Sequence, residues 1–344
     1  MQKIKTGLLG YGFAGSTFHA PVLTAVDALE LHAVASSQPA LVRRDWPAAT
    51  VYGEAAQLFA DPAIELVVIA APNEAHFGLA HAALLAGKHV VVDKPFTLTS
   101  TEAETLIACA KAQRRVLSVY HNRRWDADFL TLKALLAQGT LGRVSSFASH
   151  FDRFRPEIKQ RWRESAAPGG GLLYDLGPHM LDQALQLFGA PQRLFADLAR
   201  QRDGAVAVDY FHLVLYYEQL RVVLQAGCLV QAPTARFAVH GERGSFVKFG
   251  LDRQEDALKA GGRPGQPGWG HDPVHGALHL AGAADEACRH LPMLDGGYQR
   301  YYAGMADAIR NGAPAPVAAE DGLATIRLIE AALRSAEEGR VIAV

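Results

Sequence analysis

The chain has 344 residues, of which 49% are hydrophobic and 20% are charged, so it is long enough to bury a sizeable core and to divide into two domains. Its formal net charge is −1, which gives no electrostatic basis for binding nucleic acid or an anionic membrane surface. The three cysteines are widely spaced and include no C-x-x-C pair, so neither a disulfide framework nor a thiolate zinc site is indicated.

The N-terminus enters a predicted strand almost immediately, which leaves no room for a signal peptide. No apolar run approaches the roughly 20 residues that a membrane-spanning helix needs. We therefore expect a cytoplasmic protein that has no nucleic-acid partner and no membrane partner.

The first predicted strand, Ile4 to Leu9, runs directly into a Gly-x-Gly-x-x-Gly sequence. In a dinucleotide-binding unit the first glycine permits a tight turn, the second lets the backbone approach a pyrophosphate, and the third lets the next helix pack on its strand. An amphipathic segment, Ser16 to Val26, and a second strand, Leu31 to Ala35, follow as that unit requires. We predict that the cofactor is bound by Gly10, Tyr11, Gly12, Phe13, Ala14 and Gly15.

The first third of the chain alternates apolar runs with amphipathic stretches, which is typical of a parallel, doubly wound sheet. The further strands predicted here are Leu66 to Ala71, His89 to Val92 and Val116 to Tyr120, and the helices are Glu74 to Ala86 and Thr101 to Gln113. Thr99 and Ser100 are the capping candidates for the second helix.

The pattern changes after Trp125, where consecutive strands without intervening helices indicate an antiparallel sheet in a second domain. Its predicted strands are Val144 to Phe151, Val206 to Tyr217, Arg221 to Gly227 and Ala235 to His240. Its predicted helices are Ala127 to Gln138, Tyr298 to Arg310 and Asp321 to Glu338. Residues 252–297, rich in Gly, Pro and His, are interpreted as an extended loop region.

The end of the second strand indicates which dinucleotide is bound. NAD-binding units usually place a carboxylate there to hold the ribose 2′-hydroxyl, but this chain has Ser36 and Ser37 instead. Hydroxyl side chains leave space for a 2′-phosphate, and Arg43 and Arg44 are close enough in sequence to add positive charge. We therefore favour NADP over NAD; the alternative for the two arginines is an ordinary solvated surface.

Two further segments carry candidate catalytic residues. Asp93-Lys94-Pro95 follows the strand that ends at Val92, which delivers Lys94 to the carboxyl edge of the sheet, where ligands of open α/β sheets bind. Three glycines at 169–171 precede Asp175 and His179, which would share one face of a helix. The alternatives are a surface lysine and a solvated helix face continued by Asp182 and Gln186.

Asp93-Lys94-Pro95 and the later Asp175-x-Gly-x-His179-x-x-Asp182 resemble the Gfo/Idh/MocA oxidoreductases, and the resemblance spans essentially the whole chain. The starting Gly-Tyr-Gly-Phe-Ala-Gly-x-x-Phe-His-Ala-Pro and His121-Asn-Arg-Arg-Trp-Asp126 are similar to the NADP-dependent scyllo-inositol dehydrogenase subgroup. This resemblance implies an N-terminal Rossmann domain, residues 1–121, and a C-terminal α/β domain, residues 122–344, built on a large, mainly antiparallel open sheet. It also implies catalysis by Lys94, Asp175 and His179.

The chemistry of alcohol oxidation agrees with that assignment. Removal of a hydride from carbon must be accompanied by loss of a proton from oxygen, and histidine is a suitable base because its side chain titrates near neutral pH. Lys94 can place positive charge beside the developing alkoxide, and Asp175 can orient the imidazole or bind a neighbouring hydroxyl. No H-E-x-x-H sequence or close pair of metal ligands is present, so we expect no metal.

The resemblance also suggests residues around the reacting groups. Ala71-Pro72-Asn73 resembles a Thr-Pro-Asn loop beside the cofactor, with alanine in place of threonine, and His76 either lines the cofactor or caps a helix. The remaining candidates for the cofactor are Asp93, Lys94, Pro95, Asn122, Trp125, Trp162 and Arg163, and those for the substrate are Lys94, His150, Asp152, Asp175, His179 and Tyr298. Trp125 and Trp162 could equally be core aromatics.

The sequence thus predicts an oxidoreductase that transfers a hydride between NADP and the secondary alcohol or ketone of a cyclic polyol or sugar. The alternatives are a noncatalytic NADP-binding sensor, a dihydrodiol- or biliverdin-type reductase, and a glycosidase that uses the cofactor transiently. We also expect a homodimer or homotetramer formed through the C-terminal sheet.

Overall fold

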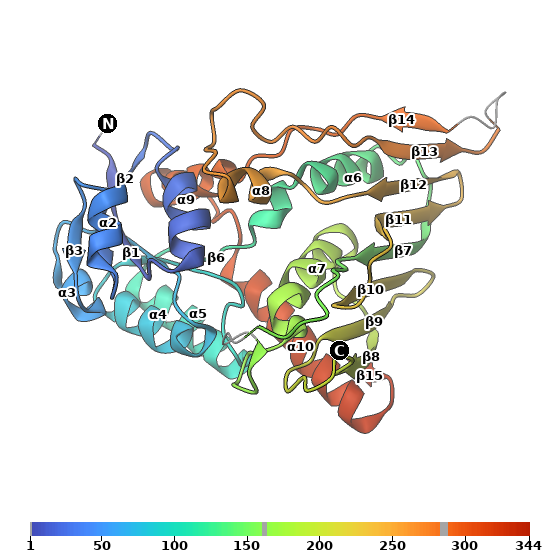
Figure 1. Cartoon of the computed structure of the whole chain (residues 1–344), viewed down its shortest axis with the longest axis horizontal. Helices are drawn as coiled ribbons and strands as arrows, with labels where there is room; N and C mark the ends of the chain where they lie inside the picture. The colour runs from blue at the N-terminus through green and yellow to red at the C-terminus, as the bar shows by residue number, and fades with distance from the viewer. Residues whose placement is uncertain (1, 160–163, 283–287) are drawn as a thin grey trace. The chain divides into compact units, whose positions relative to one another are not determined.

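The computed structural model describes residues 2–159, 164–282 and 288–344 (Figure 1). The chain forms two compact units, each assembled from separate stretches of sequence. Unit 1 contains Met1–Trp125, Gln254–Trp269 and Gly297–Ile326, and unit 2 contains Asp126–Arg253, Gly270–Gly296 and Arg327–Val344. No helix in the described part of the chain is long and apolar enough to span a membrane.

Unit 1 is built on a six-stranded parallel sheet with the order β3-β2-β1-β4-β5-β6. The strands are β1 (Ile4–Leu9), β2 (Leu29–Ala35), β3 (Thr50–Tyr52), β4 (Leu66–Ile69), β5 (His89–Val92) and β6 (Leu117–Val119). The order reverses between β1 and β4, and ligands of doubly wound sheets bind at the carboxyl ends of strands at such a switch point. The predicted Rossmann architecture is confirmed.

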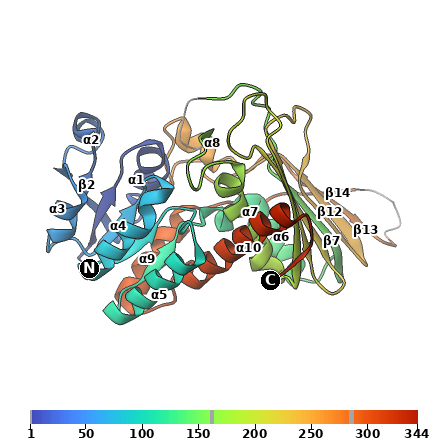
Figure 2. The ribbon, with the colours of Figure 1, turned by 90° about the horizontal axis from the view of Figure 1, so that it is seen from below.

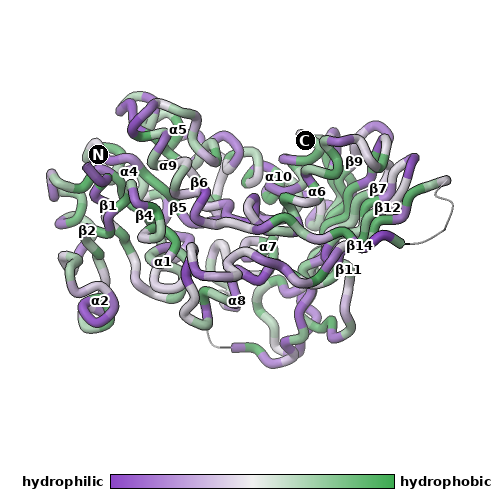
Figure 3. The backbone as a smooth tube through the Cα atoms, turned by 90° about the horizontal axis from the view of Figure 1, so that it is seen from above, coloured by the Kyte–Doolittle hydropathy of each residue, from purple (hydrophilic) through white to green (hydrophobic). Residues whose placement is uncertain are grey.

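The central strands of this sheet are hydrophobic along their whole length because helices cover both faces. All four residues of β4 and the three valines of β5 are completely buried. Figure 3 shows these strands as predominantly hydrophobic stretches of the backbone. Because a strand buried on both faces needs a continuous hydrophobic run, these strands could be predicted from the sequence.

The helices of unit 1 are α1 (Ala20–Leu23), α2 (Pro39–Asp45), α3 (Ala55–Ala60), α4 (His76–Leu85), α5 (Ser100–Gln113), α8 (Gln254–Lys259), α9 (Gln299–Asn311) and the first part of α10 (Ala319–Glu338). Some of these helices differ from the predicted ones at their ends, and α2, α3 and α8 were not predicted. The predicted segment Ser16 to Val26 is instead a π-helix, Gly15–His19, followed by the short α1. Thr99 caps α5 as expected: it accepts a hydrogen bond from Glu102 N, and the Glu102 carboxylate accepts one from Thr99 N.

Chain segments from the second half of the sequence complete unit 1. A bridge joins Ser118 of β6 to Ala318, and the Ser118 hydroxyl donates to the carbonyl of Val317 at 2.7 Å. The hydroxyl of Tyr301, on α9, donates to Ser118 Oγ at 2.8 Å. The outer edge of the Rossmann sheet is therefore closed by residues about 200 positions later in the chain.

Unit 2 is built on a nine-stranded sheet with the order β14-β13-β12-β11-β7-β10-β9-β8-β15. The strands are β7 (Val144–His150), β8 (Arg193–Ala199), β9 (Tyr210–Tyr216), β10 (Arg221–Gly227), β11 (Ala235–Gly241), β12 (Gly244–Phe249), β13 (Gly276–Leu280), β14 (Arg289–Leu291) and β15 (Ile342–Ala343). Neighbours are antiparallel except β7 and β10, which are parallel. The predicted large, mainly antiparallel sheet is confirmed.

One face of this sheet packs against helices. In Figure 2, where the sheet is seen nearly edge-on, α6 (Ala127–Ala137) and α7 (Leu172–Phe188) lie on the same side of it. Along β9 the buried residues Phe211, Leu213 and Leu215 alternate with half-buried ones, as expected for a strand with one covered face. This packing fixes the position of α7, which carries Asp175 and His179.

Three predictions for the second half of the chain need correction. The strand predicted from Val206 begins only at Tyr210, because the buried Asp209 carboxylate accepts hydrogen bonds from the backbone N–H groups of Gln201 and Arg202 and forms a turn. Residues 252–297 are not one extended loop, since they contain α8, β13 and β14. Outside that region, three strands of the sheet, β8, β12 and β15, were not predicted.

Candidate active site

The glycine-rich loop follows β1 at the switch point of the unit 1 sheet. Gly10 has a φ of 95°, and a Cβ there would collide with the carbonyl oxygen of Ala70. A Cβ on Gly15 would collide with the carbonyl oxygen of Gly10. A Cβ on Gly12, by contrast, would meet nothing within 4 Å among the described residues. Packing of the protein explains the first and third glycines, whereas Gly12 leaves space that a pyrophosphate could occupy.

Between these glycines, Tyr11 is buried and holds the loop in place, whereas Phe13 is exposed. The Tyr11 hydroxyl donates to Asp45 Oδ2 at 3.0 Å and accepts a hydrogen bond from Trp46 Nε1 at 2.8 Å. Burial and the nearby Asp45 carboxylate raise the pKa of Tyr11 to about 12. Phe13 is 58% exposed. Tyr11 therefore ties the loop to the end of α2 in its neutral form.

The end of β2 carries no carboxylate in the structure, as its sequence indicated. Ser36 Oγ accepts a hydrogen bond from Gln38 N at 3.0 Å, while Ser37 is exposed. Arg44 is paired with Asp45 at 2.7 Å. Arg43 is exposed and forms no ion pair within the described ranges. Of the two arginines, Arg43 is therefore the one whose charge is available to a 2′-phosphate.

His76 joins two loops at the same edge of the sheet. Its Nδ1 lies 2.7 Å from the carbonyl oxygen of Pro95, and its Nε2 lies 3.0 Å from that of Ala71. The ring is completely buried, and burial lowers the pKa of His76. It thus holds the segment Ala71, Pro72 and Asn73, which follows β4, against the one that follows β5. The role predicted for these residues in cofactor binding stays a prediction.

Asp93 and Lys94 follow β5, and the Lys94–Pro95 peptide bond is cis. The Asp93 carboxylate is buried, accepts a hydrogen bond from Lys94 N at 2.8 Å, and lies 3.7 Å from Nε2 of His19. Burial alone would raise the pKa of this carboxyl, but His19 and the neighbouring Lys94 and His76 hold it well below its usual range. Asp93 is therefore a buried carboxylate that fixes the backbone of Lys94.

Other cofactor and substrate candidates lie in unit 1. Asn122 is buried, and Trp125 packs edge-on against Tyr301 with ring centroids 5.8 Å apart. Tyr298 belongs to unit 1, and its side chain is completely buried. Trp162 and Arg163 lie outside the described residues.

Asp175 and His179 lie on α7, which continues through Pro178 from Leu172 to Phe188. Asp175 is half-buried, whereas His179 and Asp182 are buried, with exposures of 6% and 1%. The polar stripe of this helix is therefore not a solvated face. The glycines before α7 are required by the protein backbone itself, because a Cβ on Gly171 would lie 2.9 Å from the carbonyl oxygen of Val208.

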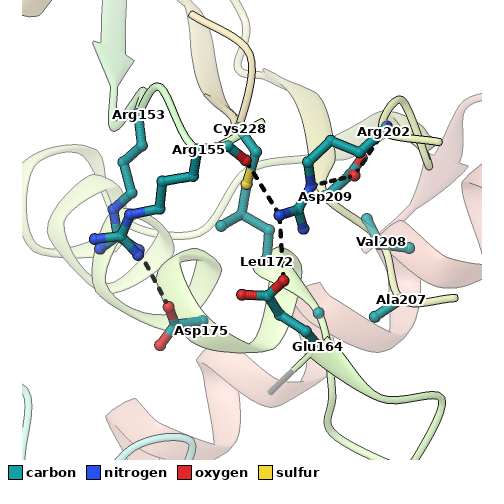
Figure 4. Close-up of a pocket in the computed structure, with 11 residues that line it drawn as sticks. Arg153, Arg155, Glu164, Leu172, Asp175, Arg202, Ala207, Val208, Asp209 and Cys228 are labelled. Carbon is teal, nitrogen blue, oxygen red and sulfur yellow. Dashed lines mark hydrogen bonds and ion pairs between the residues drawn. The ribbon is translucent and has the colours of Figure 1, made fainter. Parts of the chain in front are cut away.

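A small pocket lies beside Asp175 at the start of α7 (Figure 4). Its cavity volume is about 30 Å³. The lining residues are Arg153, Arg155, Glu164, Gly171, Leu172, Asp175, Arg202, Ala207, Val208, Asp209 and Cys228. Arg153 Nη1 lies 3.5 Å from Asp175 Oδ2. Sequence reasoning missed these arginines, which stand in irregular segments with no recognisable spacing.

His150 and Asp152 line a second cavity of about 300 Å³, which shares Arg153 with the first. His150 Nδ1 lies 2.9 Å from the carbonyl oxygen of Ala235. The Asp152 carboxylate accepts hydrogen bonds from Gly227 N at 3.0 Å and from Thr234 Oγ1 at 2.9 Å. Asp152 thus holds the ends of strands together, and contact of either residue with substrate stays a prediction.

The donor set in the described residues suits an organic cofactor. The open space at Gly12, the exposed Ser37 and the available Arg43 fit a phosphorylated dinucleotide. No group of three or more His, Cys, Asp or Glu side chains in the described part of the chain is arranged to hold a metal ion.

Two models of one protein family match the two parts of the chain. The family model described as the NAD-binding Rossmann fold of an oxidoreductase family, GFO_IDH_MocA, matches residues 4–121. The model of the C-terminal alpha/beta domain of the same family matches residues 133–344.

The chain is also similar to proteins over their full length. It is 44% identical over 344 residues to scyllo-inositol 2-dehydrogenase (NADP(+)) IolW of Bacillus subtilis, covering 99% of this chain and 96% of that protein. It is 51% identical over 336 residues to the uncharacterized oxidoreductase YdgJ of Escherichia coli, covering 98% and 97%. The solved structure of the YPO2259 protein of Yersinia pestis is 52% identical, with a TM-score of 0.95 and coverage of 100% and 97%.

Proposed function

Because the chain belongs to the Gfo/Idh/MocA family of oxidoreductases, we propose that it is an NADP-dependent dehydrogenase that interconverts a secondary alcohol and a ketone of a cyclic polyol or sugar. The observation that carries the proposal is the arrangement at one edge of the unit 1 sheet. Asp93-Lys94-Pro95 follows β5 at the edge where Gly12, after β1, leaves open space. The loop proposed to bind the cofactor and the lysine proposed to act on substrate therefore both follow strands that end at that edge.

The preference for NADP is supported by the end of β2. Ser36 and Ser37 stand where a carboxylate would repel a 2′-phosphate, and Arg43 is available to pair with one. The relative IolW is named as NADP-dependent, which agrees with this proposal.

The chain's own residues then divide the reaction among them. NADP, when bound, supplies the nicotinamide that exchanges a hydride with the substrate carbon. His179 removes the proton from the substrate hydroxyl during oxidation and returns it during reduction. Lys94 stabilises the negative charge that develops on that oxygen, and Asp175 orients a neighbouring hydroxyl or the imidazole.

The experiment is a panel of inositols and aldoses supplied with NADP, with reduced cofactor followed by absorbance. Lys94→Met and His179→Asn should each lower kcat by about 100-fold or more, because each removes a group that acts on the transferred proton or charge. Lys111→Met, an exposed cation of α5, is the matched control and should keep normal activity.

Cofactor binding distinguishes the alternatives. His179→Asn should still bind NADP with the affinity of the unmodified protein, since the substituted residue lies in unit 2. Tight NADP binding with no turnover of any polyol or carbonyl compound would indicate the noncatalytic sensor instead. Net conversion of a glycoside without accumulation of reduced cofactor would indicate transient use of NADP.

We also propose that copies of the chain associate through the face of the nine-stranded sheet opposite α7. That face presents half-buried residues of β9, among them Tyr210, Val214 and Tyr216. Light scattering at micromolar concentration should give the mass of a dimer or tetramer, and a monomeric mass would contradict the proposal.

A further inference from the structure

Asp93, the residue before Lys94, has a contact on each of its two carboxylate oxygens. Oδ1 accepts the backbone N–H of Lys94 at 2.8 Å, and Oδ2 faces Nε2 of His19 at 3.7 Å. Both His19 and Asp93 are buried. One buried carboxylate therefore joins the backbone of Lys94 to an imidazole that has no part in the proposed reaction.

The polar partners of His19 determine how its ring is oriented. An ionised carboxylate only accepts hydrogen bonds, so the nitrogen that faces Asp93 carries a hydrogen in either protonation state of the ring. At 3.7 Å the attraction between them is electrostatic and not a direct hydrogen bond. The second nitrogen, Nδ1, lies 2.6 Å from the hydroxyl of Tyr302. Burial raises the pKa of Tyr302 well above its usual value, so this hydroxyl keeps its proton and can donate to the neutral imidazole.

Aromatic rings fix the position of the imidazole. Its centroid lies 4.3 Å from that of Tyr120, which follows β6, and 6.3 Å from that of Tyr302, on α9. The Tyr120 hydroxyl donates to the carbonyl oxygen of Phe18 at 3.1 Å and so holds the backbone next to His19. His19 and Tyr302 are completely buried, and Tyr120 is nearly so. Because such close packing leaves a side chain little room to reorient, the ring is held in one place beside Asp93.

His19 also connects Lys94 to the glycine-rich loop. It is the last residue of the π-helix Gly15–His19, which begins at the third glycine of that loop. One short element therefore runs from the loop proposed to bind the cofactor to the contact with Asp93. A lysine that stabilises charge on the substrate must stand at a defined distance from the nicotinamide, since a displacement of about 1 Å can reduce a rate about 100-fold.

We propose that His19 is a positioning residue: held by Tyr302 and acting through Asp93, it sets the place of Lys94 relative to the cofactor loop. The inference rests on the proposed dehydrogenase function, in which Lys94 acts on the substrate. The alternative is a buried pair that contributes to stability alone. The two explanations differ in whether loss of the pair affects Lys94 more than other residues of unit 1.

Two buried tyrosines of α9 provide matched variants. Tyr302→Phe removes the hydroxyl that contacts His19, and Tyr301→Phe removes the one that donates to Ser118 Oγ at 2.8 Å. Each variant keeps the ring and loses one buried hydrogen bond, so both should lower the melting temperature by similar amounts. Only Tyr302→Phe should also lower kcat, by about fivefold or more, with the Kd for NADP within about twofold of normal. Equal kcat values for the two variants would overturn the proposal.

Substitution of His19 itself tests the direction of its N–H. His19→Gln keeps an N–H for Asp93 and should retain kcat within about threefold, whereas His19→Leu should lower kcat about tenfold or more. Equal kcat values for these two variants would contradict the positioning role. If His19→Leu does not fold, the tyrosine pair still decides the question.

Amide hydrogen exchange at Lys94 tests the positioning without turnover. The Lys94 N–H donates to Asp93, so in the full chain its exchange should be about fivefold or more faster in Tyr302→Phe and unchanged in Tyr301→Phe. The amide of Lys111, on α5, is the reference for general loosening of unit 1. Faster exchange at Lys94 alone, in a protein that oxidises no polyol, would keep the positioning role and remove the dehydrogenase function. Unchanged exchange and unchanged kcat in Tyr302→Phe, in a protein that does oxidise polyols, would remove the positioning role and keep the dehydrogenase function.

Discussion

Nε2 of His19 lies 3.7 Å from the carboxylate of Asp93, and both residues are buried. Asp93 directly precedes Lys94, the residue proposed to act on substrate. The other ring nitrogen of His19 lies 2.6 Å from the Tyr302 hydroxyl, so the imidazole is held from both sides. Asp93 in turn accepts the backbone N–H of Lys94. A chain of contacts thus runs from α9 to the catalytic candidate entirely within unit 1.

His19→Phe should lower the free energy of unfolding by about 3 kcal/mol, because it removes the imidazole that lies 3.7 Å from the buried Asp93 carboxylate. Asp93→Asn in the same background should recover part of this loss, since the amide carries no charge. The measurement is a double-mutant cycle by urea unfolding. Strictly additive effects would show that the two side chains do not interact.

Gly12→Ala should leave the unfolding free energy within about 0.5 kcal/mol, because the added methyl group meets no described atom within 4 Å. It should nevertheless weaken NADP binding tenfold or more by filling the space proposed for the pyrophosphate. Gly10→Ala is the contrasting variant: its φ of 95° and the nearby Ala70 carbonyl should cost about 1–3 kcal/mol. Fluorescence titration and thermal unfolding measure the two effects, and unchanged NADP affinity in Gly12→Ala would argue against this binding site.

Arg43→Ala should raise the Kd for NADP about tenfold and leave the Kd for NAD unchanged, because only NADP carries a 2′-phosphate to pair with the guanidinium. Arg44→Ala is the matched control, since that side chain is already paired with Asp45 at 2.7 Å. The two dissociation constants are compared for each variant. Equal weakening of both cofactors, or an equal effect at Arg44, would remove Arg43 from the 2′-phosphate site.

Stability should decline as pH falls from about 6.5 to about 4, in part through His89. Burial, followed by the nearby Arg115, lowers the pKa of His89 to about 4, and its Nδ1 accepts the backbone N–H of Val116 at 2.9 Å. The unfolded chain takes up this proton near pH 6.5, whereas the folded chain takes it up only near pH 4. Protonation therefore favours the unfolded state, and the free energy of unfolding falls as pH falls through that window. The loss should be about 1–2 kcal/mol after allowance for the partial exposure of the ring.

His89→Gln keeps an acceptor for Val116 but does not titrate, so its stability should vary less over the same pH window. Thermal unfolding in a series of buffers measures the difference, with His240→Gln, on an exposed strand residue, as the control. Parallel pH curves for the unmodified protein and His89→Gln would contradict this assignment.

Much of the Rossmann sheet was predictable because its strands are short, continuously hydrophobic and followed by glycine or polar residues at the carboxyl edge. The strands of unit 2 were harder to delimit. Asp209 interrupts the alternating run before β9 with a turn that depends on its hydrogen bonds to Gln201 and Arg202, which are not evident from spacing. The strands β13 and β14 lie in a region of weak periodicity and are specified by pairing with β12 and each other.

The candidate site shows a similar division. Strand ends predicted the positions of Lys94 and of the Ala71 loop, because carboxyl ends of parallel strands meet at one edge. His76 was predicted either to line the cofactor or to cap a helix, and its contacts with Pro95 and Ala71 show a brace between loops. Neither His19 nor Arg155 could be singled out, since their surroundings are formed by segments distant in the sequence.

The closure of β6 by Val317 and Ala318 has a practical consequence for dissecting the molecule. A fragment that ends at residue 121 would contain all the residues that match the Rossmann family model. It would lack α9 and the segment that bridges to Ser118. Its last strand would present an unsatisfied edge and the cavity left by Tyr301 and Tyr302. Such a fragment would aggregate when expressed by itself, so cofactor affinity is properly measured on the intact polypeptide.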